Sequence, residues 1–241
     1  GVAMGARGTD VAREAAALVL LNDDFSSLVT AIRYGRRIFA NLRKAMVFVL
    51  AVHIPIVGLS MLPVLLGWPM LLMPVHILFL QLIIDPACSI VFEAEALDAD
   101  AMTVPPRRPD ARLFEGAVLT RGLWQGSGLL LLLLALFGGA RAVSGSDEMA
   151  RALTFSVLVA SSLGLIYVNR SWGHASGLAA SQANPYFLWM ILASIAVLAV
   201  ILCVPVISKL FAFSLPSPIL MSVGLGVALV STLWFEGVKR V

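Results

Sequence analysis

An acid in the middle of a long apolar run is the feature of this sequence that points most directly to chemistry. Asp85 stands in the segment Gln81-Leu-Ile-Ile-Asp85-Pro86. An ionised carboxylate in hydrocarbon is costly unless it is paired or hydrated, so such residues mark ion pathways. Hard cations prefer oxygen ligands. We therefore predict a cation or metal site at Asp85, with the amide of Gln81 one helical turn away on the same face. The structural alternative is that Asp85 only pairs with a neighbouring helix.

Two prolines stand beside the candidate ligands. Pro86 has no N–H to donate and disfavours helical geometry at Asp85, and Pro55 lies within the preceding apolar run. We expect helix breaks at Pro86 and Pro55. Broken helices that free backbone carbonyls form ion sites near the midplane of transporters.

His53 lies in that preceding run, about 12 Å into the membrane by its rise per residue. Asp85 is at a similar depth in the next run, so we predict that the two side chains face each other. A neutral His53 could ligate a transition metal, and a protonated one could act as a countercharge. The alternative is a hydrogen bond from His53 to a carbonyl freed by Pro55. His76, near the opposite end, is expected to be structural, with a gate-lining role as the alternative.

Three further residues could line a pathway to Asp85. Cys88 and Ser89 follow it by three and four residues, and Glu93 lies at the end of the same run. A single cysteine is weak evidence for a soft-metal site. Glu93 and Glu95 could attract entering cations, but a solvated helix end is the preferred explanation. No residue is assigned a catalytic role.

The elements that must position these residues are membrane-spanning helices. Of the 241 residues, 60% are hydrophobic and only 13% are charged, so lipid must solvate most of the chain. Crossing about 30 Å of hydrocarbon takes about 20 helical residues. Six runs are long enough, at about 45–66, 71–92, 117–140, 152–168, 185–207 and 219–235. Gly122 and Gly126 form a small-residue pair that permits close helix packing.

The basic residues predict the orientation. All of the 17 Lys and Arg residues except Arg141, Arg151 and Lys209 fall on the side that holds both termini. We therefore expect both termini in the cytosol. The net charge of +3 is a topology signal and not a sign of nucleic-acid binding, because no basic face interleaved with exposed aromatic residues is present.

Residues 1–43 differ from the rest because they mix charged and apolar positions. They predict a strand end, a short helix, a short strand and a long helix that continues into the first span. These elements lie at Gly1–Gly5, Val11–Ala17, Leu18–Leu21 and from Phe25 onward, with Thr9 or Asp10 as the first N-cap. These four elements are too few to bury a hydrophobic core by themselves. We therefore expect a fragment of a larger α/β domain.

The run from Gly1 to Ala45, GVAMGARGTDVAREAAALVLLNDDFSSLVTAIRYGRRIFANLRKA, closely resembles the end of the phosphorylation domain of P-type cation pumps. The resemblance implies a mainly α fold. A polytopic six-helix transmembrane bundle at 44–241 follows a small α/β remnant of a HAD-like phosphorylation domain at 1–43. It also implies ATP-driven cation transport through an aspartyl phosphate, with ATP and Mg²⁺ serving the full-length parent.

The same resemblance bears on the membrane site. Asp85 matches the acid of the Asn-x-x-Thr-Asp motif of calcium-pump-like families. Gln81 and Ile84 stand at its Asn and Thr positions, and His53 and Ile56 replace an Asn and a Glu of the preceding helix. The chain thus keeps the central acid and lacks the second one, which leaves the transported cation open.

The motif that carries the phosphate is absent from this sequence, so we expect no ATP hydrolysis by the chain alone and no cofactor bound to it. The expected partners are the lipid bilayer, the transported cation and the missing N-terminal half of the same pump, and we expect the plasma membrane as its location. The alternatives are a stand-alone six-helix channel or cation-binding module, or a remnant that transports nothing.

Overall fold

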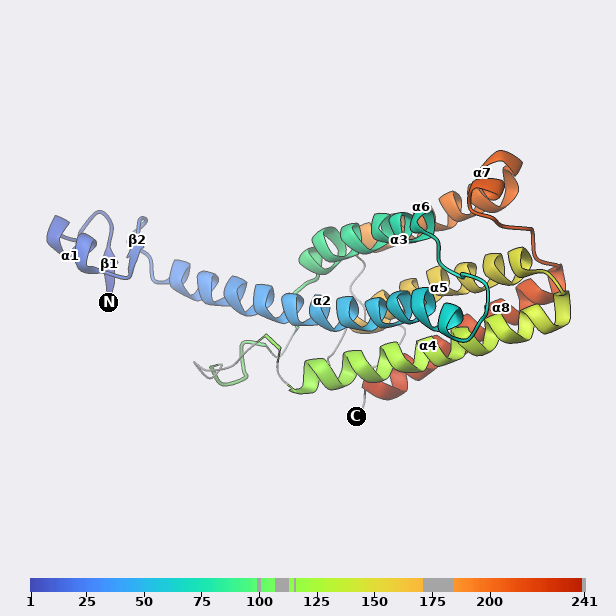
Figure 1. The fold of residues 1–241 in the computed structure, drawn as a ribbon. Helices are drawn as coiled ribbons and strands as arrows, with labels where there is room; N and C mark the ends of the chain where they lie inside the picture. The colour runs from blue at the N-terminus through green and yellow to red at the C-terminus, as the bar shows by residue number, and fades with distance from the viewer. Residues whose placement is uncertain (99–100, 107–112, 115, 171–183, 240–241) are drawn as a thin grey trace. The chain divides into compact units, whose positions relative to one another are not determined.

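Helices make up most of the protein in the computed structural model, which describes residues 1–98, 101–106, 113–114, 116–170 and 184–239 (Figure 1). The chain divides into two compact units. The first comprises Gly1–Ala40 and Ala96–Pro109, and the second comprises Asn41–Glu95 and Asp110–Val241. This architecture confirms the mainly α fold class with a small α/β segment at the N-terminus.

The α/β segment of the first unit is a two-stranded parallel sheet with one helix between its strands. Strand β1 (Val2–Met4) pairs with β2 (Leu18–Leu20), and α1 (Asp10–Ala15) connects them. Thr9 is the N-cap of α1, and its hydroxyl accepts a hydrogen bond of 3.2 Å from the N–H of Ala12. The predicted element types are confirmed.

Two aspartates organise the turn between β2 and the long helix α2 (Ser26–Leu65). Asp23 has a positive φ of 54°, and its carboxylate accepts hydrogen bonds of 2.9 Å from the N–H groups of Ala6 and Arg7. Asp24 accepts a hydrogen bond of 2.8 Å from the N–H of Ser26 at the start of α2. Hydrogen bonds from the side chain and backbone of Ser26 lower the pKa of Asp24 below its ordinary value of 3.8.

Six helices of the described residues are long and apolar enough to cross a membrane. They are α2, the pair α3 (Pro74–Pro86) and η1 (Ala87–Phe92), α4 (Gly116–Ser144), α5 (Asp147–Arg170), α6 (Pro185–Cys203) and α8 (Pro218–Lys239). The chain is therefore an integral membrane protein. The boundary that the sequence places between residues 43 and 44 stays a prediction.

The end of the fifth span differs from the expectation. The predicted run continued to residue 207, whereas α6 ends at Cys203 and a short helix α7 (Pro205–Leu210) follows. The cause is Pro205, which pushes the residue before it out of helical geometry. Val204 accordingly adopts an extended conformation with φ −90° and ψ 112°.

Helix α5 forms the centre of the second unit and packs against α4 and α8. It is the most buried of the six spans. Small residues permit this packing: the hydroxyls of Ser161 and Ser231 are 2.8 Å apart, and Gly164 lies against Thr232 of α8.

The contact between α2 and α4 depends on two glycines. A Cβ atom at Gly122 would lie 2.7 Å from the side chain of Leu50, and one at Gly126 would lie 2.7 Å from the carbonyl oxygen of Ala51. The close packing predicted for this glycine pair is confirmed.

The helix break predicted at Pro55 is wrong, because α2 continues through it. Pro55 removes the helical donor to Ala51 but leaves the bonds on either side, and tight packing holds the helix together.

Candidate functional site

Asp85 lies in the last turn of α3, with its side chain exposed in this chain. Gln81, one turn earlier, is half-buried. Ser89 on η1 donates its hydroxyl to the backbone carbonyl of Asp85 over 2.7 Å. The serine hydroxyl uses one of the two lone pairs of that oxygen, and the exposed carboxylate of Asp85 is open to a cation.

Pro86 changes the helix without unwinding it. The α-helix ends at Pro86 and continues as the π-helix η1. The backbone stays helical, with φ −65° and ψ −31° at Pro86, and the N–H of Ala87 donates to the carbonyls of Ile83 and Ile84. The predicted break is thus a change of helix type, because the wider π-turn accommodates a residue that has no N–H. Such π segments are frequent at functional sites.

His53 is half-buried in the middle of α2. Its Nδ1 lies 2.8 Å from the carbonyl oxygen of Val49, one turn earlier. A carbonyl can only accept, so Nδ1 donates the hydrogen and a neutral ring keeps the lone pair of Nε2 for a ligand. The bond does not use the carbonyl of Ala51 that Pro55 leaves without its helical donor. That His53 faces Asp85 stays a prediction.

The role of Cys88, Ser89 and Glu93 as pathway residues stays a prediction. Cys88 is half-buried, whereas Ser89 and Glu93 are exposed. Within the described ranges, no group of three or more His, Cys, Asp or Glu side chains is arranged to hold a metal ion. A cation at Asp85 would thus need ligands beyond those that the described residues bring together.

Glu95 belongs to a network that the sequence did not reveal. Its carboxylate forms an ion pair with Arg170 at the end of α5, and the two side chains are only 12% and 4% exposed. Asn184, the N-cap of α6, donates to the same carboxylate over 2.7 Å, and Asn41 of α2 donates to the backbone carbonyl of Glu95 over 2.8 Å. The guanidinium also lies 4.5 Å from the ring centre of Phe187. Glu95 therefore joins helices and does not form an open entrance.

His76 is fully buried at the other end of the bundle. Its Nδ1 accepts a hydrogen bond of 3.0 Å from the N–H of Met73, and its Nε2 lies 2.8 Å from the carbonyl oxygen of Phe211. The ring stacks on Phe213 at a centroid distance of 4.9 Å. Both nitrogens are used, which agrees with the structural role expected for His76.

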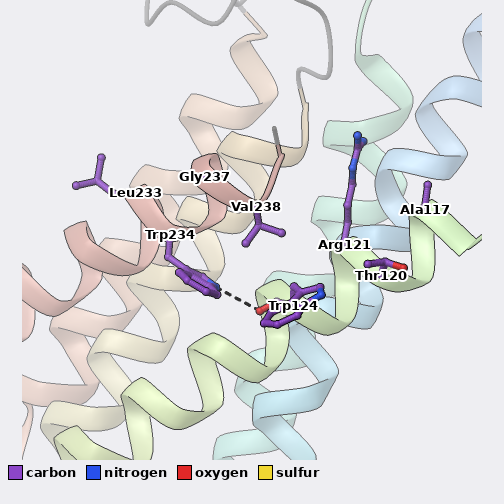
Figure 2. Close-up of a pocket in the computed structure, with 8 residues that line it drawn as sticks. All are labelled: Ala117, Thr120, Arg121, Trp124, Leu233, Trp234, Gly237 and Val238. Atoms are coloured by element: carbon purple, nitrogen blue, oxygen red, sulfur yellow. Dashed lines mark hydrogen bonds between the residues drawn. The ribbon is translucent and has the colours of Figure 1, made fainter. Parts of the chain in front are cut away.

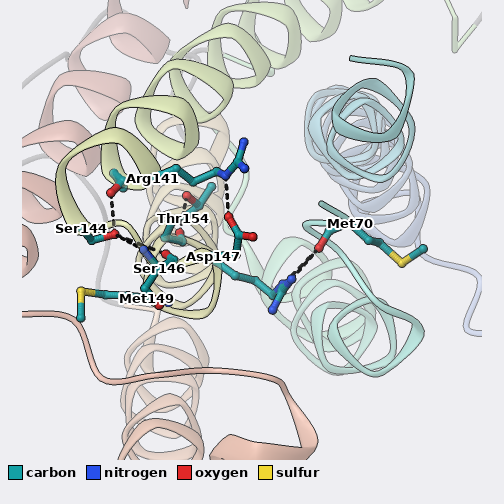
Figure 3. Close-up of polar contacts among 10 residues, drawn as sticks. Met70, Arg141, Ser144, Ser146, Asp147, Met149 and Thr154 are labelled. Carbon is teal, nitrogen blue, oxygen red and sulfur yellow. Dashed lines mark hydrogen bonds and ion pairs between the residues drawn. The ribbon is translucent and has the colours of Figure 1, made fainter. Parts of the chain in front are cut away.

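Arg151 joins two loops at that end. It is 6% exposed, and its guanidinium donates to the carbonyl of Met70 over 3.1 and 2.9 Å and to that of Ala212 over 2.9 Å. Figure 3 shows the bond that reaches Met70 and, beside it, the ion pair of 2.6 Å between Arg141 and Asp147. The sequence counted Arg151 only as a topology charge. No local pattern in the sequence signals these contacts, because Met70 and Ala212 are 81 and 61 positions away.

The chain resembles known proteins along most of its length. Residues 69–241 match the family described as cation transporting ATPase, C-terminus. Calcium-transporting ATPase 1 of Bacillus cereus is 33% identical over 231 residues, which cover 88% of this chain and 26% of that protein. Calcium-transporting ATPase of Bacillus subtilis is 30% identical over 217 residues, or 88% of this chain and 24% of its own length.

A further relative is named for the transport of sodium and potassium instead of calcium. The sodium/potassium-transporting ATPase subunit alpha of Hydra vulgaris is 39% identical over 109 residues, which cover 45% of this chain and 11% of that subunit. The chain spans about a quarter of the length of the two Bacillus relatives.

Proposed function

The chain belongs to the P-type cation-transporting ATPase family, whose C-terminal region it matches, and on this premise we propose that it carries the membrane transport portion of an ATP-driven pump, with Asp85 binding the transported cation. The observation that carries the proposal is the position of Asp85. It is the single acid within the six predicted apolar runs, and it stands where α3 becomes a π-helix. An acid at such a depth is a functional site by default.

The exposed side of Asp85 supports a site completed by other parts of the pump. A carboxylate that faces lipid is strongly disfavoured, so another polar surface must cover it in the membrane. The relatives are about four times longer than the matched region. We propose that the rest of the same pump supplies the covering helices and the missing ligands. Gln81 supplies an amide oxygen, and the Nε2 lone pair of His53 is a candidate ligand for a transition metal.

Helix α2 supports a coupling role. It is continuous for 40 residues from the first unit into the first span. A continuous helix transmits displacement along its axis because each turn is bonded to the next. We propose that ATP and Mg²⁺ act on the rest of the pump and that α2 transmits the resulting movement to the region of His53. The distribution of Lys and Arg supports cytosolic termini, and we place the pump in the plasma membrane.

The test uses the full-length pump in membrane vesicles and measures phosphorylation by ATP across a panel of Ca²⁺, Mg²⁺, Mn²⁺, Zn²⁺, Na⁺ and K⁺. One cation should stimulate phosphorylation, and Asp85→Asn should weaken its apparent affinity at least a hundredfold. The control is Asp147→Asn. It replaces a carboxylate by an amide at the opposite end of the bundle, in a side chain that is 47% exposed. Unchanged cation dependence in Asp85→Asn would refute the site. His53→Ala tests the histidine separately, and an unchanged cation profile would remove it from the site.

A further inference from the structure

A pocket of about 630 Å³ lies between α4 and α8 (Figure 2), and Asp85 does not line it. Its walls are mainly apolar and include two indole rings and one basic side chain. The lining residues are Ala117, Thr120, Arg121, Trp124, Leu233, Trp234, Gly237 and Val238. None of these eight described residues is acidic. The volume is in the range of pockets that bind small organic ligands.

The pocket lies at one end of both helices. Arg121 is five residues from the start of α4, and Val238 is one residue from the end of α8. Helix ends of membrane spans lie near the lipid headgroups, where tryptophan and arginine are favoured. Trp124 and Trp234 are 56% and 42% exposed, as expected for rings at that level. The pocket thus presents a basic polar group and an apolar wall at the depth where lipid headgroups meet acyl chains.

The two tryptophans have different roles. The indole N–H of Trp234 donates to the carbonyl oxygen of Trp124 over 3.2 Å (Figure 2). Gly128 permits this approach, because a Cβ atom there would lie 2.3 Å from the indole nitrogen of Trp234. The indole of Trp234 is therefore fixed by the protein as a wall of the pocket, while Trp124 contributes both its carbonyl to that bond and its ring to the lining.

We propose that this pocket binds one phospholipid with an anionic headgroup, with the phosphate at Arg121 and an acyl chain against Trp234. Arg121 also interacts within the protein, but a guanidinium has five N–H donors and can serve two acceptors. The hydroxyl of Thr120 adds a further donor for phosphate oxygens. Charge complementarity selects the headgroup, and the apolar wall selects a lipid over a free phosphate ion. The inference needs only that these helices span a membrane, and it does not depend on the role of Asp85.

Two glycines of α8 provide a matched test. A Cβ atom at Gly237 or at Gly226 would meet no other atom within 4 Å, and both residues are exposed. Gly237 lines the pocket, whereas Gly226 does not. Leucine at either position also favours the helix relative to glycine. Gly237→Leu should therefore fill the pocket without disturbing the packing, and Gly226→Leu is its control.

The experiment is native mass spectrometry of the full chain in detergent, titrated with palmitoyl-oleoyl phosphatidylglycerol or with the phosphatidylcholine of the same acyl chains. The wild-type protein and Gly226→Leu should retain one tightly bound phosphatidylglycerol. Gly237→Leu should weaken that binding at least fivefold. Arg121→Gln should abolish the preference for phosphatidylglycerol over phosphatidylcholine, and it carries the test alone should Gly237→Leu not fold.

Two outcomes would overturn the proposal. In the first, Gly237→Leu and Arg121→Gln bind phosphatidylglycerol as the wild-type protein does. In the second, the wild-type protein retains a single-span polypeptide in place of lipid, and Gly237→Leu releases it. That result would identify a protein helix as the occupant of the pocket.

Discussion

Replacing Glu95 by glutamine tests the buried ion pair between Glu95 and Arg170. The substitution keeps the shape and one side-chain oxygen for Asn184 but removes the negative charge beside a guanidinium that is 4% exposed. Removing one partner of a buried pair costs about 3–5 kcal/mol, because the other charge stays buried. Glu95 is 12% exposed, so water screens part of the charge, and we expect about 3 kcal/mol for Glu95→Gln.

The assay is unfolding of the full chain by sodium dodecyl sulfate in mixed micelles, followed by circular dichroism. The internal control is Asp147→Asn. It breaks the pair with Arg141, in which the two side chains are 47% and 29% exposed, so the loss should stay below about 1 kcal/mol.

A double-mutant cycle separates the pair from other effects of each change. Arg170→Gln alone should also cost about 3 kcal/mol, but the double variant should lose little more than either single one. The coupling energy should therefore be about 2 kcal/mol or more. A coupling energy below about 0.5 kcal/mol would refute the reasoning, because it would mean that the two side chains contribute independently.

Three further predictions concern the ends and packing of the helices. Arg151→Met should lower the free energy of unfolding by about 2–5 kcal/mol in the same assay, because two loop carbonyls lose their donors. Gly126→Ala should destabilise by about 1–3 kcal/mol through the clash with the carbonyl of Ala51, whereas Gly226→Ala should not. The pKa of Asp24 is lowered in the folded chain, so its contribution is present above pH 3.8 and is lost as the pH falls through the lower folded value. The protection factors of amides at the start of α2, which compare exchange with its intrinsic rate at each pH, should fall over that acidic range in the wild type, and Asp24→Asn should remove the dependence while keeping a cap. Destabilisation by Gly226→Ala as large as that by Gly126→Ala would contradict the packing argument.

Much of the fold could be predicted because the backbone N–H and C=O groups of each spanning helix are hydrogen-bonded within the same segment. A run of about 20 apolar residues in lipid must be a helix, whatever its neighbours are. Thr9 as N-cap, the strand at Leu18 and the start of the long helix near Phe25 were equally local. The end of α6 was missed although Pro205 was visible, because hydropathy continued across it.

The candidate site was predictable only in part. Asp85 could be identified from the sequence because it is an acid within an apolar run. That its side chain is exposed could not be predicted from the sequence. Pro86 predicted a change of helix geometry. Whether that change is an unwound segment or a π-helix depends on the hydrogen bonds that neighbouring residues form. His53 was predicted to be a possible ligand, and the structure adds that Nδ1 is bonded to Val49.

The sequence by itself determined the number of spans, the family and the one acid inside the six predicted apolar runs, because these depend on the composition of single segments. Only the tertiary structure decided what each polar side chain does at the helix ends. Glu95 and Arg170 are 75 positions apart, and Arg151 reaches Met70 across 81. Such partners meet only when separate helices pack, so no local pattern records them. The pocket between α4 and α8 exists for the same reason, since its two walls come from helices whose bonded tryptophans are 110 positions apart.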